Sequence, residues 1–293
     1  MNKLLSEKVV NTLNTFQLSA RQIVEGFMVG LHKSPYHGFS AEFADHKQYI
    51  PGDQIKDIDW KVYAKTNRYY VRRYEEETNL RAYIILDHSN SMSFKSHDIQ
   101  KLYYAKMLSA SLTYLISRQK DAVGLFTFNN DITFYQAPRT HQGFISGLYK
   151  KLFELEADST TNSVAVLHKI AEKIKKRSLI IIISDLLDSA EDLVKGFRHF
   201  KYQNHEVIVF HITDPQEREF LYKKETIFID SETAEEVRVL PWQIKDIYKE
   251  NYSKFFNDIK EKCAQSNIEY VPLTTETPLE ESLLRYLVRR ERV

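Results

Sequence analysis

Hydrophobic positions along the chain form short continuous runs, separated by longer stretches with helical spacing. The runs Tyr83–Leu86, Leu179–Ile183 and Val207–Phe210 are apolar at every position, which is typical of strands buried on both faces of a parallel sheet. Between the first two runs, the stretch 98–118 carries apolar residues along one helical face. This alternation predicts an α/β fold with a doubly wound, mostly parallel sheet.

A short antiparallel pair is expected at one edge of that sheet. Ala122–Phe128 has the composition of a strand, and the polar turn Asn129–Asp131 leads into a second strand at 132–135. A further hairpin is expected from strands at 226–230 and 235–240. The remaining elements are expected as a strand at 268–271 and helices at 142–155, 163–176, 193–202, 241–265 and from about Pro278 onward.

Residues 1–79 are expected to form a helical and β-strand region that flanks a main domain at 80–293. Helical spacing within 3–31 predicts one long helix or two shorter ones, and Tyr69–Tyr74 is expected as an edge strand beside the segment that follows. The segment Gly38–Trp60, with its Pro-Gly turn and clustered Asp and Lys, is too short to bury a core of its own. We therefore expect it to pack on the main domain through Phe43, Tyr49, Ile58 and Trp60.

The composition is that of an ordinary soluble protein, and its charge balance gives no sign of a strongly charged partner. Lys and Arg together number 41 against 40 for Asp and Glu, so bulk charge gives no case for a nucleic-acid or membrane partner. The single cysteine, Cys263, excludes an internal disulfide and any cysteine-rich zinc site. No apolar run approaches the ~18 residues of a membrane helix, and the first residues are charged. We expect a cytoplasmic protein.

Polar side chains follow two of the apolar runs at the point where each run ends. Asp87, Ser89 and Ser91 follow the first run at alternate positions, and Asp185 follows the second. The carboxyl ends of parallel strands open onto one crevice, which the Ser/Thr-rich loop 158–163 is also expected to reach with Thr160 or Thr161. Such hard oxygen donors suit Mg²⁺. The alternative is a polar turn that caps the following helix.

This pattern resembles the von Willebrand factor A-like domain and its metal-ion-dependent adhesion site. The matching residues are Asp87-His-Ser89-Asn-Ser91, Thr161 with Thr160 as its rival, and Asp185. The resemblance covers about residues 80 to 273. The upstream motif, which spans Gly38–Trp60, is similar to that of a bacterial family of uncharacterised proteins that combine it with such a domain. Members of that family are typically encoded beside MoxR-type AAA+ ATPases.

The resemblance implies a metal-dependent interaction protein that is not an enzyme. It implies that Ser89, Ser91 and Thr161 bind Mg²⁺ directly, with Mn²⁺ or Ca²⁺ as possible replacements, while Asp87 and Asp185 hold the ion mainly through water. A Glu or Asp from a protein partner would complete the coordination. A MoxR-type ATPase is the partner that the resemblance suggests, in the assembly or maturation of another complex.

Two other functions remain open from the sequence. A metal-dependent hydrolase could use Asp87 as a nucleophile, but this chemistry requires further charged groups at the metal, such as a second Asp and a Lys. No lysine stands at a spacing from Asp87 that would indicate this role. The basic tail with Arg285, Arg289, Arg290 and Arg292 could bind nucleic acid, although its arginines fit better as the solvated face of a last helix.

Overall fold

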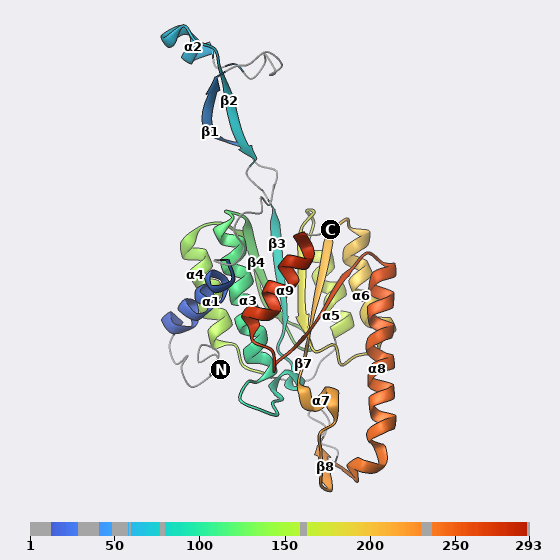
Figure 1. Cartoon of the computed structure of the whole chain (residues 1–293). Coiled ribbons are helices and arrows are strands. Elements are labelled where there is room, and N and C mark those ends of the chain that lie inside the picture. The colour runs from blue at the N-terminus through green and yellow to red at the C-terminus, as the bar shows by residue number, and fades with distance from the viewer. Residues whose placement is uncertain are drawn as a thin grey trace.

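A six-stranded sheet forms the centre of the computed structural model (Figure 1). The structure describes residues 13–28, 41–48, 58, 60–76, 80–158, 163–229 and 236–291. The strand order is β10-β7-β6-β3-β4-β5, and every neighbouring pair is parallel except β4 and β5. The strands are β3 (Arg81–Asp87), β4 (Ala122–Phe128), β5 (Ile132–Arg139), β6 (Leu179–Ser184), β7 (Glu206–Thr213) and β10 (Glu269–Thr274). The expected fold class is confirmed, including the antiparallel edge strand.

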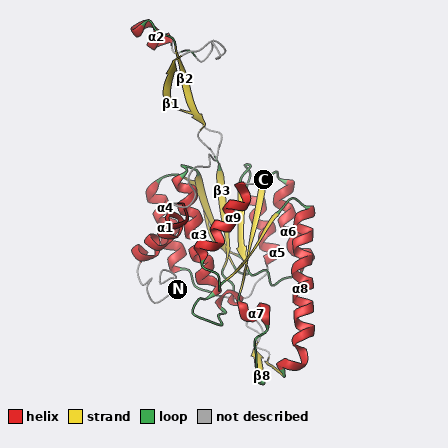
Figure 2. Ribbon diagram, in the orientation of Figure 1, coloured by secondary structure: helices red, strands yellow, loops and turns green. Residues whose placement is uncertain are grey.

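Helices cover both faces of this sheet (Figure 2). One face is covered by helices α1, α3, α4 and α9, and the other by α5, α6 and α8. Their bounds are α1 (Leu13–Met28), α3 (Lys101–Arg118), α4 (Gln142–Glu154), α5 (Ser163–Lys173), α6 (Ala190–Tyr202), α8 (Pro241–Gln265) and α9 (Leu279–Glu291). Within the described ranges, every helix is too short or too polar to cross a bilayer.

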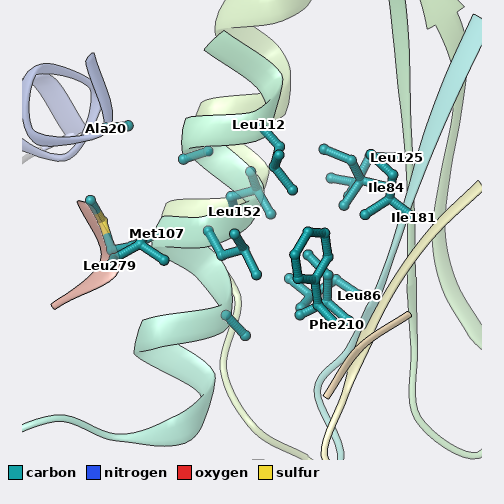
Figure 3. Packing of buried hydrophobic residues seen from close by; sticks show 14 of the residues in the cluster. Ala20, Ile84, Leu86, Met107, Leu112, Leu125, Leu152, Ile181, Phe210 and Leu279 are labelled. Atoms are coloured by element: carbon teal, nitrogen blue, oxygen red, sulfur yellow. The ribbon is translucent and has the colours of Figure 1, made fainter. Parts of the chain in front are cut away.

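The buried side chains divide into two clusters, one on each face of the sheet. Successive residues of a strand point to opposite faces, so Ile84 and Leu86 of β3 face the first cluster while Tyr83 and Ile85 face the second. Figure 3 shows how the first cluster joins β3 to the helices of its face. The lone Cys263 lies fully buried in the second cluster, and burial raises the pKa of its thiol to about 12. It is therefore a packing residue without thiolate character.

The amino-terminal region contributes to the main core through α1. This helix packs against α3, α4 and α9, and its apolar residues Phe16, Ala20, Ile23 and Val24 are at most 1% exposed within the first cluster. Burial of each of the three larger side chains contributes about 1.5–3 kcal/mol to stability. The helix is thus part of the main domain's core.

The strands of the amino-terminal region form a separate antiparallel pair. Strand β2 (Tyr70–Glu76) pairs with β1 (Ala41–Gln48), so the expectation that it lies as an edge strand beside the segment that follows was wrong. Figure 1 shows this pair and α2 (Trp60–Thr66) beyond the amino-terminal end of β3.

The expected anchors of the Gly38–Trp60 segment are only partly described. Ile58 is buried, but Trp60 is 56% exposed and its ring meets Tyr63 edge-on, which corrects its expected role as a buried anchor. Tyr49 and the Phe43 side chain lie outside the described part of the chain. The division of the chain at residue 80 into a flanking region and a main domain stays a prediction.

An arm leaves the opposite end of the sheet, where the strands end. It begins with the short helix α7 (Pro215–Glu219) after β7 and continues into the antiparallel pair β8 (Thr226–Ile229) and β9 (Glu236–Val239). Aromatic contacts of Phe220 with Tyr222, Phe228 and Tyr248 hold the arm to the first turns of α8. Figure 1 shows α7 and β8 beyond the carboxyl ends of the parallel strands.

Candidate metal site at the carboxyl edge of the sheet

Asp87 ends β3 at the centre of the sheet, and backbone and side-chain donors fix both of its carboxylate oxygens. Oδ1 accepts a hydrogen bond from the backbone N–H of Ser89 at 2.9 Å, and Oδ2 accepts one from the Ser184 hydroxyl at 2.7 Å. Ser184 ends the neighbouring strand β6 and also accepts a hydrogen bond from the Leu186 N–H. Asp87 is only 1% exposed, so its position and orientation are set by the ends of two strands.

The hydroxyls of Ser89 and Ser91 converge beside Asp87. Their Oγ atoms lie 3.1 Å apart, at the start of the short 3₁₀ helix Asn90–Ser93. The two hydroxyls are hydrogen-bonded to each other, and two ligands on neighbouring corners of a Mg²⁺ octahedron with bonds of 2.0–2.1 Å would be about 2.9 Å apart. The serine spacing therefore fits one edge of such an octahedron, and the donor set fits a hard divalent cation.

Asp185 follows β6 and lies at the same edge of the sheet, 3% exposed. Its backbone carbonyl accepts a hydrogen bond from Nε2 of His211 at 3.0 Å. Burial lowers the pKa of His211 to about 3, so its ring is neutral and Nδ1 accepts from the Tyr270 hydroxyl at 2.6 Å. The His211 ring thus fixes the backbone of Asp185. The direction of the Asp185 carboxylate is set by other contacts.

The contact that directs this carboxylate is a buried lysine. Nζ of Lys101, the first residue of α3, lies 2.8 Å from Oδ2 of Asp185 and 2.6 Å from Oε1 of Glu217 in α7. The Lys101 side chain is fully buried. Burial lowers the pKa of Lys101, but the two carboxylates together raise it above its ordinary value. The ammonium group therefore stays charged and joins the strand end to the arm.

The electrostatics of the site favour a further cation. Burial, with the nearby charge of Asp185 as the second cause, raises the pKa of Asp87 to about 7. Burial likewise raises the pKa of Glu217, although Lys101 beside it acts in the opposite direction. Asp87, Asp185 and Glu217 place three carboxyl groups at one edge with the single ammonium of Lys101 between two of them. A divalent cation would relieve the repulsion that remains.

The structure brings together four of the residues predicted for the site. Asp87, Ser89, Ser91 and Asp185 lie at one edge of the sheet, whereas Thr161 and its rival Thr160 lie outside the described residues. His88 points elsewhere, with its ring nitrogens 2.9 Å from the Glu156 carbonyl and 2.8 Å from the Thr133 hydroxyl. No group of three or more His, Cys, Asp or Glu side chains suited to a metal gathers within the part of the chain that the structure describes.

Three residues at this edge were not found from the sequence. The sequence around Ser184 and Glu217 does not indicate a role at this edge, but the position of Lys101 in its helix does. It stands on the same helical stripe as Ala105, Leu108 and Leu112, which are all buried. A lysine on such a stripe is buried, and a lysine is fully buried only when it is paired.

A groove of the described surface borders this edge at His211, which bonds the Asp185 carbonyl. This groove of about 850 Å³ runs between α8 and α9 along the free edge of β10. Tyr252, Phe256 and Tyr286 line it, together with charged side chains such as Lys260 and Arg289. Asp87, Ser89, Ser91 and Asp185 are not among the residues that line this groove.

Residues 45–258 match the family described as protein of unknown function DUF58. This match covers well over half of the chain. The chain belongs to the DUF58 family. Among similar curated proteins, the uncharacterized proteins Rv1480 of Mycobacterium tuberculosis and Mb1516 of Mycobacterium bovis are each 24% identical over 230 residues, which cover 78% of this chain and 72% of theirs. The resemblance to an uncharacterised bacterial family is thereby confirmed at the level of the family.

Several solved structures are similar to this DUF58 chain. BatB of Bacteroides thetaiotaomicron is 15% identical with a TM-score of 0.48, over 73% of this chain and 100% of its own. An aerotolerance-related membrane protein of Bacteroides fragilis is 17% identical with a TM-score of 0.49, over 73% and 98%. The VWA domain of SpRpn10 is 14% identical with a TM-score of 0.42, over 72% and 95%.

Proposed function

We propose that this DUF58 protein is a metal-dependent protein-interaction module of the von Willebrand A-like class. The observation that carries the proposal is the convergence of Asp87, Ser89 and Ser91 at the centre of the carboxyl edge, with serine hydroxyls at the spacing of an octahedral edge. Mostly neutral ligands leave positive charge on a bound Mg²⁺. That charge would attract a carboxylate from a partner protein.

The protein's own residues would hold the ion in two ways. Ser89 and Ser91 would supply direct hydroxyl ligands, and Thr161 is the candidate for a third. Asp87 is held away from direct contact by its bonds to Ser184 and to the Ser89 backbone, so it would act on the ion through water. When bound, the ion supplies a Lewis-acidic point that a partner's Glu or Asp can bind.

Calorimetric titration of Mg²⁺ and Mn²⁺ into the full chain tests this proposal. We expect weak binding by the wild type and none by Asp87→Ala or Ser89→Ala. Ser146→Ala is a matched control, because Ser146 is an exposed serine whose hydroxyl only bonds the Gln142 carbonyl of its own helix. Equal binding by wild type and Asp87→Ala would place the ion elsewhere and remove the proposed function's basis.

A MoxR-type AAA+ ATPase is the partner we propose for the site. The support for this is the family resemblance carried by Gly38–Trp60 and by the Asp87 motif, since such ATPases are typically encoded beside its members. Capture of the ATPase by the full chain in Mg²⁺, lost in chelator and lost in Asp87→Ala, would support this partner. Capture that is indifferent to chelator would show an interaction that does not use the metal.

A metal-dependent hydrolase is the second candidate, and one observation favours it. The Lys and second Asp that phosphoryl-transfer chemistry needs are both present, as Lys101 and Asp185, near Asp87. Two contacts weigh against it. Lys101 is already engaged by Asp185 and Glu217, and both oxygens of Asp87 accept hydrogen bonds, which makes that carboxylate a poor nucleophile.

A further inference from the structure

Lys101 occupies the place at which a cation would meet Asp185. Its ammonium group lies 2.8 Å from Oδ2 of Asp185, the carboxylate whose charge acts on Asp87. Its side chain is fully buried and that of Asp185 is 3% exposed, so water screens this charge only weakly. A second positive charge brought to the same carboxylate would have to share its lone pairs with Lys101 and would be repelled by it.

The lysine is held in place from two sides. Glu217 binds the same ammonium group at 2.6 Å, and α7 holds Glu217 through a capping box in which Oε2 accepts from the Asp214 N–H at 3.0 Å. Asp214 in turn accepts hydrogen bonds from the Ser96 hydroxyl and from the Ser96 N–H, just before α3 begins. Lys101 is thus fixed at both of its ends, in its helix and at its ammonium group.

We propose that Lys101 is a built-in competitor of the divalent cation at this site. It neutralises Asp185 in the free protein, so that Asp87, acting through water, is the carboxylate left to hold Mg²⁺ beside the hydroxyl ligands, and the ion is held weakly. Removal of the lysine charge then strengthens Mg²⁺ binding instead of weakening it. This inference rests on the proposed function, because it assigns a role to Lys101 toward that same ion.

The test is calorimetric titration of Mg²⁺ into the full chain and its variants. We expect Lys101→Met to bind Mg²⁺ at least tenfold more tightly than the wild type, because the competing charge is gone while Asp185 remains. Lys101→Arg keeps the charge and should stay within about threefold of the wild type. Lys106→Met is the matched control on the same helix, since Lys106 donates to the carbonyls of Phe153 and Leu155 away from the site.

A second variant and a second measurement cover the case in which Lys101→Met does not fold. The pair Lys101→Met with Glu217→Gln removes one positive and one negative charge together, so the local balance is unchanged. It should also bind Mg²⁺ more tightly than the wild type, and Mg²⁺ should raise its unfolding temperature by more than it raises that of the wild type. If Lys101→Met folds only when Mg²⁺ is added, the ion replaces the lysine and the inference is supported.

The outcomes separate this inference from the proposed function. Wild-type or weaker Mg²⁺ affinity in Lys101→Met and in the pair with Glu217→Gln, with no binding by Asp87→Ala, overturns the competitor role and leaves the metal site intact. No binding in any protein overturns the metal site and the inference with it. Binding by Lys101→Met and by the pair with Glu217→Gln, but not by the wild type or Lys101→Arg, supports the inference, because the lysine charge then keeps the ion out of the wild-type protein.

Discussion

The hydroxyl of Ser184 donates a hydrogen bond to Oδ2 of Asp87 at 2.7 Å, across the ends of two neighbouring strands. The same hydroxyl accepts from the Leu186 N–H, which leaves it one orientation. Asp87 is therefore oriented by a residue 97 positions away in the chain. This contact sets where the carboxylate stands relative to the Ser89 and Ser91 hydroxyls.

Replacement of Ser184 by Ala should weaken metal binding without removing it. A hydrogen bond to a charged group contributes about 1.5–3 kcal/mol, which corresponds to a loss of roughly tenfold or more in Mg²⁺ affinity. Calorimetry on Ser184→Ala and on the exposed control Ser146→Ala measures the difference. An unchanged affinity in Ser184→Ala would show that Asp87 does not need this orientation to serve the ion.

The pH dependence of unfolding should report the raised pKa of Asp87. Folding in the absence of metal raises the pKa of Asp87 from 3.8 to about 7. The contribution of this carboxyl group to the free energy of unfolding is therefore fully present below about pH 4 and is lost as the pH rises through 7. Between pH 5.5 and 7 the loss is up to ~2 kcal/mol. Thermal unfolding in chelator should show this slope in the wild type and a smaller one in Asp87→Asn.

Magnesium provides the internal control for that measurement. A bound divalent cation favours the ionised form of Asp87, so the slope contributed by this group should flatten when Mg²⁺ is added to the wild type. The Asp87→Asn protein should respond little to the ion. The same slope in all of these proteins would mean that other groups produce it and that the carboxyl group of Asp87 is not shifted.

The sequence was sufficient for most of the sheet because its strands are buried on both faces. A short continuous apolar run such as 179–183, with helical segments on either side, predicts a buried strand. The long helix α8 was expected at 241–265, the bounds that the structure gives it. The place of Asp87, Ser89, Ser91 and Asp185 at the carboxyl edge follows from their position just after buried parallel strands. These predictions depend on neighbours in the sequence or on a general topological rule.

The features that the sequence did not reveal depend on partners far along the chain. Lys101 meets Asp185 and Glu217, which are 84 and 116 residues away, and periodicity alone does not show which carboxylates share a buried lysine. The pairing of β2 with β1 has the same origin. Helix α2 lies between β1 and β2 in the chain, and strand composition alone does not show with which segment a strand pairs.

Two apolar residues of the amino-terminal region should differ strongly in their contribution to stability. Ile23 of α1 is fully buried in the first cluster, whereas Trp60 is 56% exposed. Ile23→Ala should therefore lower the free energy of unfolding by about 2–5 kcal/mol, and Trp60→Ala by no more than ~1 kcal/mol. Denaturant unfolding of the two variants measures this. A larger loss from Trp60→Ala would restore the tryptophan as an anchor on the main domain.

The absence of hydrolysis is the prediction that separates the two candidate functions most directly. We expect the purified full chain to release no phosphate from p-nitrophenyl phosphate or from nucleotides in Mg²⁺ or Mn²⁺, because both oxygens of Asp87 are bound and Lys101 is committed to two carboxylates. A measurable rate that disappears in both Asp87→Asn and Lys101→Met would establish the hydrolase instead. The lysine variant is decisive here. A catalytic Lys101 would make it inactive, whereas a competitor of the cation would make it bind Mg²⁺ more tightly while the rate stays at zero.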